Sequence, residues 1–160
     1  MTGEYILSIV VAALLGGAIG LEREYRSKEA GFRTHFLVGL GSGLLIVLSM
    51  HGFDEFLGIQ GIQRDPSRIA AQVVSGMGFI GAGCIIFQKN AVKGLTTAAG
   101  LWVTSAIGMT AGAGMYLLAL VATALVLLCL EGSNFIHHKI FHEKEEPEDS
   151  YEPNTKRSDS

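Results

Sequence analysis

The 160-residue chain is too apolar for an ordinary soluble domain, because apolar residues make up 49% of it and charged residues only 17%. Its formal net charge is −3, and it has no excess of basic residues to offer phosphates, so nucleic acid is excluded as an expected partner. From Leu95 to Leu130 there is no charged residue. As one helix this stretch would be about 54 Å long, against about 30 Å for a hydrocarbon core. It must fold back on itself, and the sequence therefore predicts an integral membrane protein.

We predict an all-α fold, a polytopic transmembrane helix bundle of about five spans within residues 1–142. The apolar segments are Tyr5–Leu21, Thr34–Met50, Ile69–Phe87, Leu95–Met109 and Ala113–Leu130. Several are shorter than the usual ~20 residues, so flanking residues are expected to extend them. The last two spans are expected to be joined by a turn at residues 111–114. A short interfacial helix is expected between His51 and Arg68.

The connection after the first span, GLEREYRSKEAGFRTHF (Gly20–Phe36), carries much of the charge of the chain. Lys and Arg counted over alternate sides of the five spans total ten on the side of this connection and two on the other. Basic residues favour the cytoplasmic side. The count predicts an outside N-terminus and a cytoplasmic C-terminus, so that the acidic tail, residues 143–160, is a disordered cytoplasmic segment.

The same connection predicts a particular helix end. Glu22 and Arg26 are four residues apart and would share a face if the first helix continues beyond the membrane. Gly31 is expected to end that extension, and Thr34 to cap the next helix.

Two interpretations of these charges remain open. One is a solvated, self-neutralising helix end. The other is a basic cytoplasmic cluster in which Arg23, Arg26 and Arg33 join Lys89 and Lys93 beside Thr96 and Thr97, at the start of the fourth span. Because helix N-termini attract anions, such a cluster would suit a lipid phosphate or an acidic partner.

The third span begins with polar residues. Asp65 followed by Pro66 is typical of a helix start, with the carboxylate as cap. Arg68 and Gln72 lie on one face and lead into the membrane, where polar side chains usually face the bundle interior or water. Arg68 either extends to the interface or takes part in binding, and the sequence leaves both open.

Glycines recur at four-residue spacing in several spans, as in Gly16/Gly20 and Gly39/Gly43. In the third span, Gly76–Gly81 matches the dinucleotide fingerprint G-x-G-x-x-G, but it lies within an apolar segment without the strand and acidic residue that this fingerprint requires. Small residues at this spacing favour close contact between membrane helices. We therefore expect tight packing within the bundle or between subunits of a homo-oligomer.

His138 and His142 lie one helical turn apart after the last span. They could hold a metal ion together with an acidic ligand, but a solvated helix end is the favoured interpretation, and no metal or other cofactor is predicted.

Three stretches of the chain occur in a recognisable order: GLEREYRSKEAGFRTHFLVGLGS (Gly20–Ser42), RDPSRIAAQVVSGMGFIGAG (Arg64–Gly83) and VKGLTTAAGLWVTSAIGMTAGAG (Val92–Gly114). Together they resemble the membrane domain of the MgtC/SapB family. The resemblance implies a multi-pass protein of the bacterial inner membrane, associated with magnesium limitation, acid stress and survival in hosts. It further implies a regulator that acts through other membrane complexes, including the ATP synthase.

The resemblance also supplies candidate binding residues. Carried over by motif position, they are Glu22, Arg23, Arg26, Arg33, Thr34, Asp65, Arg68, Gln72, Thr96, Thr97 and Trp102. Many members of the family have a soluble domain after the last span, whereas this sequence continues into an acidic tail. The activity is accordingly expected to come from the membrane bundle and its short loops.

Three classes of function can be compared with these sequence features. A regulatory interaction protein agrees with the glycine-rich faces and the basic connection. An oligomeric transporter or channel for Mg²⁺ or another ion is the alternative, although the predicted spans contain no Asp or Glu to serve as hard oxygen ligands. An enzyme is not expected, because no nucleophile with a recognisable base, no H-E-x-x-H motif and no phosphate-binding loop is found.

Overall fold

The structure is a computed structural model that describes residues 2–53, 65–88 and 91–141, with side chains as far as residue 132. The chain divides into a compact unit, Met1–Leu128, and a second unit, Cys129–Ser160. The predicted interfacial helix, the His138/His142 pair and the acidic tail lie wholly or largely outside the residues whose side chains are described.

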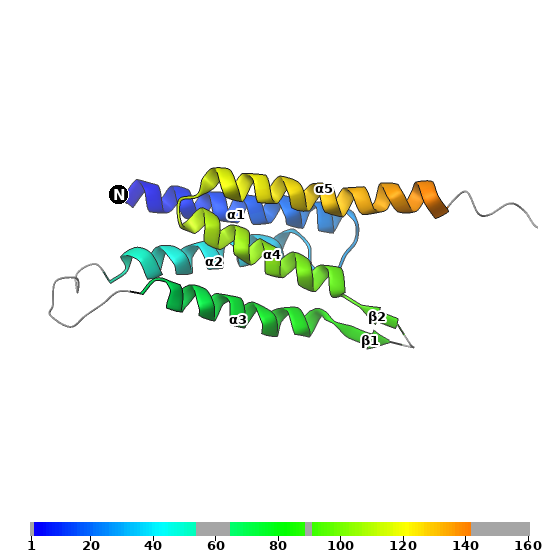
Figure 1. The fold of residues 1–160 in the computed structure, drawn as a ribbon, viewed down its shortest axis with the longest axis horizontal. Coiled ribbons are helices and arrows are strands. Elements are labelled where there is room, and N and C mark those ends of the chain that lie inside the picture. Colours follow the sequence, from blue (N-terminus) through cyan, green and yellow to red (C-terminus); the bar gives the residue numbers. More distant parts are fainter. Residues whose placement is uncertain (1, 54–64, 89–90, 142–160) are drawn as a thin grey trace, which may run out of the picture. The chain divides into compact units, whose positions relative to one another are not determined.

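Helices make up most of the described residues (Figure 1). They are α1 (Thr2–Tyr25), α2 (Phe32–His51), α3 (Ser67–Cys84), α4 (Leu95–Gly112) and α5 (Tyr116–Phe141), with a hairpin of β1 (Ile86–Gln88) and β2 (Ala91–Lys93) between α3 and α4. The predicted all-α class is thus confirmed for the described residues apart from this hairpin.

The hairpin corrects the third predicted span, which was expected to stay helical as far as Phe87. Instead α3 ends at Cys84, and Ile85 takes an extended conformation with φ −90° and ψ 118°. The β-branched and aromatic residues that follow prefer strands, and Ile86 pairs with Lys93 in antiparallel register. Gly94 closes the hairpin with a φ of +87°, in contact with the carbonyl oxygen of Cys84, a place that no side chain could occupy.

Among the described residues, two helices are long and apolar enough to cross a membrane, α1 and α2. A shorter apolar segment, Tyr116–Gly132, lies within α5. The polar and glycine residues of α3 and α4 lower their mean hydropathy, which explains why these helices are not in that class. The count of five spans and the orientation therefore stay predictions.

Helices α1, α2 and α4 pack against one another through glycines (Figure 1). A methyl group on Gly39 would lie 2.5 Å from the carbonyl oxygen of Ala12, and one on Gly108 would lie 2.5 Å from that of Gly39. A methyl group on Gly112 would likewise lie 2.6 Å from the carbonyl oxygen of Gly43. The backbones touch because these side chains are absent. Close packing within the bundle is thus confirmed for these helices.

Helix α3 lies at the edge of this core and packs mainly against α4 (Figure 1). Its buried residues are Met77 and Gly81, and Met77 joins a small apolar cluster with Leu101 of α4. In contrast, a methyl group on Gly76 or Gly78 would meet no atom within 4 Å. Most of the glycine-rich run of α3 therefore makes no close contact inside the chain.

The start of α2 differs from the prediction. Helix α1 ends at Tyr25, and Gly31 is the N-cap of α2 rather than the end of α1. Thr34 lies inside the first turn and is not the cap. The cap function is taken by Glu24, whose Oε2 accepts the N–H of Phe32 at 2.7 Å. Helical spacing could not predict that Glu24, eight residues before Phe32, would be the acceptor, because this contact depends on how the chain between α1 and α2 folds back.

Two other predicted features are confirmed: the start of α3 at Asp65 and the turn between α4 and α5. Asp65 Oδ1 accepts the backbone N–H of Ser67 at 3.0 Å and also its hydroxyl, at the start of α3. At the turn near residues 111–114, α4 ends at Gly112 and Gly114 has a φ of +79°. The hydroxyl groups of Ser8 and Tyr116 lie 2.7 Å apart and join the beginning of α5 to α1.

Candidate functional site

A charged cluster closes the C-terminal end of α1. Glu22 accepts hydrogen bonds from Nε of Arg23 and, at 2.7 Å, from its Nη2. The second guanidinium, that of Arg26, lies 3.7 Å from Glu22 Oε1, which confirms the predicted i,i+4 pair. Arg23 is only 3% exposed. We call these three residues the Glu22 cluster; its carboxylate is shared by two cations, and Arg23 faces the protein rather than a partner.

His35 lies beside the Glu22 cluster, fully buried among α1, α2 and α4. Its Nδ1 lies 3.1 Å from the carbonyl oxygen of Gly31, whereas Nε2 is buried without a hydrogen-bond partner. That nitrogen lies 3.6 Å from the position of a methyl group on Gly100. His35 is not among the residues predicted from the sequence, although a titratable residue inside an apolar segment is a recognised functional signal.

The first connection contacts the start of α4 through Glu29. Thr97 is buried, and its hydroxyl donates to Glu29 Oε2 at 3.1 Å. The pKa of Glu29 is lowered by a backbone hydrogen bond first, then by Thr97, and to a smaller extent by the charges of Lys28 and Lys93. The connection thus reaches the start of α4 through a carboxylate that was not among the predicted residues. The predicted basic cluster beside Thr96 and Thr97 stays a prediction, and Lys89 lies outside the described residues.

A groove of about 930 Å³ separates part of α2 from α3. We call it the α2–α3 groove. Arg33 and Thr34 line one end of it, from the first turn of α2, and Gln72 of α3 lines it farther along. Because the two helices are antiparallel, Gln72 lies toward the opposite end from Arg33. Three predicted binding residues thus share one groove, which their sequence separation did not reveal.

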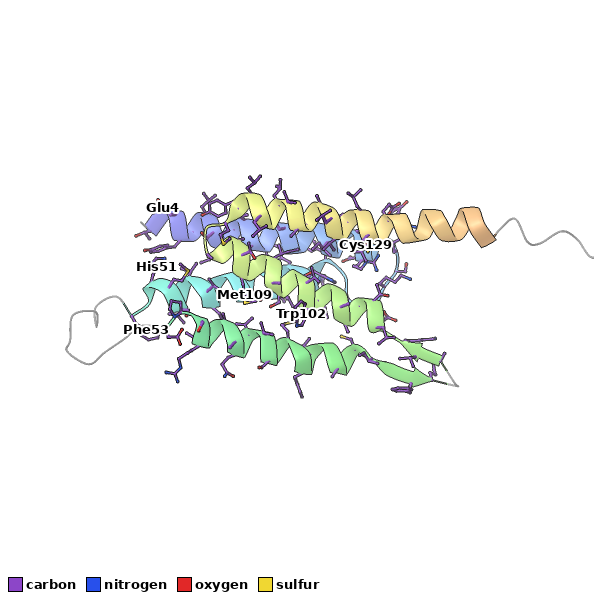
Figure 2. All side chains as sticks on the ribbon, viewed as in Figure 1. Glu4, His51, Phe53, Trp102, Met109 and Cys129 are labelled. Carbon is purple, nitrogen blue, oxygen red and sulfur yellow. The ribbon has the colours of Figure 1, made fainter. Side chains whose placement is uncertain are left out.

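The remaining predicted residues lie elsewhere. Asp65 and Arg68 are exposed at the beginning of α3, at the same end of the unit as Glu4 and His51 and away from the hairpin (Figure 2). The pKa of Asp65 is lowered by the hydroxyl and then the backbone N–H of Ser67, and further by the charge of Arg68. Thr96 is exposed at the start of α4, and Trp102 is 48% exposed farther along that helix. The structure therefore does not gather all eleven candidates into one site.

Buried hydroxyls continue the polar interior along α4. The hydroxyl groups of Ser42 and Ser105 lie 2.8 Å apart in the interior, and Thr104 donates to the carbonyl oxygen of Gly100 at 2.8 Å. Ile19, Leu101 and Ile107 are likewise fully or almost fully buried. Within the part of the chain that the structure describes, no group of three or more His, Cys, Asp or Glu side chains could hold a metal ion. The arrangement is that of a packed interior with satisfied hydroxyls.

The comparison with known families decides the identity. The model of the MgtC family matches residues 9–139. The chain belongs to the MgtC family. No solved structure matches it.

Similar MgtC-family chains come from several bacteria. This chain is 52% identical over 131 residues to a protein of Escherichia coli K12 named "Putative magnesium transporter YhiD", and 44% identical over 123 residues to "Protein MgtC" of Salmonella typhimurium. The matches cover 82% and 77% of this chain, but 61% and 49% of those relatives. The chain thus spans about half to three-fifths of the length of these MgtC-family relatives.

Proposed function

We propose that this MgtC-family protein is a regulator in the bacterial inner membrane that acts by binding another membrane protein, the ATP synthase being one such complex. Adaptation to magnesium limitation, acid stress or life in a host is the expected setting. The observation that carries the proposal is the outward face of α3. There a methyl group on Gly78 would meet no atom within 4 Å, and Phe79, which also lines the edge of the α2–α3 groove, is 85% exposed.

Such a face suits a helix of another protein. In a bilayer the hydrophobic effect does not drive helices together, because the surrounding lipid tails are also apolar. Close backbone approach at small residues supplies much of the attraction instead. In α1, α2 and α4 the equivalent glycines already have partners, such as Gly108 against Gly39. In α3 they do not. An exposed aromatic side chain among them offers an anchor of the kind that dominates interface energetics.

The Glu22 cluster favours the regulator over a transporter. A path for a divalent cation usually offers carboxylate or carbonyl oxygens as ligands. Glu22 already binds Arg23 and Arg26, so its negative charge is compensated. A cation entering from that end would meet guanidinium groups first.

A transporter for Mg²⁺ or another ion is the second proposal. It is supported by the printed name of the Escherichia coli relative, and by the polar side chains Gln72 and Ser75, which are exposed on α3. Copies that met through α3 would place both near a shared interface. In this case Gln72→Ala would alter ion flux.

The two functions are separated by paired measurements. A photo-crosslinking residue is placed at Phe79 on α3, and a control at Leu14, which is exposed on α1 to 61%. In bacterial membranes we expect crosslinks to a subunit of the ATP synthase, or of another inner-membrane complex identified by mass spectrometry, from position 79 and not from 14. In parallel, Mg²⁺ flux is measured in proteoliposomes. No crosslink from position 79, together with saturable flux that Gln72→Ala abolishes, would replace the regulator by the transporter.

Charge at the first connection gives a second readout. If the basic residues take part in docking, Arg33→Ala and Arg26→Ala weaken crosslinking from position 79. Arg33→Ala is the cleaner variant, because Arg26 also contacts Glu22. Full crosslinking by folded Arg33→Ala would restrict the docking surface to α3.

A further inference from the structure

The α2–α3 groove has the character of a site for a chain molecule with a charged head. Its walls are mainly aliphatic, with Leu37, Val38 and Leu45 from α2 and Ile69, Val73 and Ile80 from α3. Arg33 and Thr34 are the polar residues of one end. An apolar channel ending at a cation matches an amphipathic ligand, and not a metal ion or a soluble polar substrate.

The groove is open because two glycines supply no side chain to fill it. Gly41 of α2 and Gly76 of α3 both line it, and a methyl group on either would meet no atom within 4 Å. Helix α3 is held instead on the side of α4, where Gly81 approaches Ala98 and a methyl group on it would lie 3.6 Å from the Cβ atom of Ala98. The groove therefore results from the packing of α3 against α4, which leaves space between α3 and α2.

Arg33 provides the charge complementarity. It lies in the first turn of α2 and is exposed. Among the residues that the structure describes, its guanidinium has no ion pair, whereas Arg23 and Arg26 are both engaged by Glu22. Thr34 beside it adds a hydroxyl. A guanidinium binds a phosphate group well, because its N–H groups match the phosphate oxygens in pairs.

The length of the groove agrees with one leaflet. From Arg33 to Leu45 the helix rises about 18 Å at 1.5 Å per residue, while half of a hydrocarbon core is about 15 Å. A phosphate at Arg33 would thus lie at the membrane surface, and the acyl chain would end near the bilayer centre. The positive-inside count predicts that this end lies in the cytoplasmic leaflet, whose surface is negatively charged.

We propose that the α2–α3 groove binds one acyl chain of an anionic phospholipid, with the lipid phosphate at Arg33 and Thr34. A helix of a second copy is a poorer occupant, because a helix with side chains is about 10–12 Å across, whereas a single acyl chain is much thinner and carries its own phosphate to Arg33. Gly78 lies outside the lining of the groove, whereas Phe79 lies at the edge shared by the groove and the outward face of α3. The lipid proposal rests on the groove and on Arg33 and does not require a protein partner.

The test uses the purified full chain in detergent micelles doped with phosphatidylglycerol, or with phosphatidylcholine for comparison, and counts retained lipid by native mass spectrometry. We expect one retained phosphatidylglycerol per chain, with at least tenfold preference over phosphatidylcholine. Arg33→Ala should weaken retention of phosphatidylglycerol about tenfold, and Arg33→Lys should restore part of it. Glycerol phosphate alone should not compete, because it lacks the acyl chain.

Filling the groove gives the matched comparison. Gly41→Leu and Gly76→Leu place a side chain in the groove and should abolish lipid retention, whereas Gly78→Leu, also in open space on α3 but outside the lining, should retain lipid as wild type does. Each variant is first shown to unfold at a midpoint no lower than that of wild type. Equal retention by Arg33→Ala, Gly41→Leu and wild type would overturn the proposal. So would a lipid-free wild type that purifies as a dimer and becomes monomeric on Gly41→Leu, since the groove would then hold a second copy.

The lipid proposal and the regulator are tested independently. Gly78→Leu is expected to reduce crosslinking from position 79 while keeping the lipid, and Gly41→Leu to lose the lipid while keeping crosslinks. Loss of both readouts on either variant would show that the two surfaces are one.

Discussion

The core of α1, α2 and α4 and the peripheral helix α3 use the same kind of sequence in opposite ways. In the core, Gly39 and Gly108 let backbones touch, with 2.5 Å between the carbonyl oxygen of one and the methyl position of the other. In α3, Gly76 and Gly78 face open space. Small residues thus allow helices to pack closely. Within one chain, Gly39 and Gly108 pack in this way, whereas Gly76 and Gly78 do not.

The difference extends to polar groups. Buried polar side chains of the core bind one another, as in Ser42 with Ser105, or their own helix, as in Thr104, with His35 Nε2 as an exception. Polar residues of α3, such as Arg68 and Gln72, are exposed. The core is therefore complete within one chain, whereas α3 has surface left for a partner.

The largest expected effect is that of Glu22→Ala. It leaves the buried guanidinium of Arg23 without a counter-charge, and breaking a buried ion pair on one side costs about 3–5 kcal/mol. Because Glu22 is 13% exposed at the side chain, we expect the lower part of that range in the free energy of unfolding in detergent. Arg68→Ala, at the exposed start of α3, should change it by less than about 0.5 kcal/mol. Equal effects would mean that Arg23 can reach water once Glu22 is gone.

The next effect compares Gly108→Ala with Gly78→Ala. The methyl group on Gly108 would press on backbone atoms of Gly39, which cannot move aside alone, and overpacking of this kind costs about 1–3 kcal/mol. On Gly78 the methyl group meets nothing, so the higher helix propensity of alanine should stabilise α3 by up to about 1 kcal/mol. Thermal unfolding of both variants checks the opposite signs. A loss of stability in Gly78→Ala would show that α3 is already covered in the isolated protein.

Particular residues show what the sequence could predict. Apolar segments located the helices, Asp65 located the start of α3, and the i,i+4 rule found the pair of Glu22 and Arg26, because all of these depend on local spacing. The hairpin was missed, since Ile86 and Phe87 suit a strand as well as an apolar helix, and the contact of Gly94 with Cys84 decides between them. His35 was missed for a different reason: its burial results from three helices that meet only in the fold.

A smaller effect is expected at the buried hydroxyl pair. Double-mutant cycles on hydrogen bonds between membrane helices average about 0.6 kcal/mol and reach about 1.7. Ser42→Ala and Ser105→Ala should therefore each destabilise the protein modestly, and the double variant by less than the sum. Ser75→Ala, on the exposed surface of α3, is the control and should have no effect. Strict additivity of Ser42→Ala and Ser105→Ala would mean that the 2.8 Å contact contributes nothing to stability.

The smallest effect concerns two carboxylates with lowered pKa values. Glu29 accepts from Thr97 across the fold, whereas Asp65 accepts from Ser67 two residues away. A pKa that is lowered in the folded state adds stability above the ordinary value, and this contribution is lost as pH falls through the lowered value. Glu29→Gln should therefore lower the unfolding midpoint at neutral pH, and the difference from wild type should shrink on acidification.

Asp65→Asn should lower the midpoint at neutral pH by less than Glu29→Gln does, because asparagine still caps the helix although the charge is lost. Thr97→Val identifies the contact: if the Thr97 hydroxyl contributes to the lowered pKa of Glu29, the effect of Glu29→Gln must be smaller in that background. A difference between wild type and Glu29→Gln that stays constant down to the acid limit would sink the linkage, since it would then come from the shape of the side chain and not from its charge. In that case the contact between the first connection and α4 would stabilise the fold through packing and not through charge.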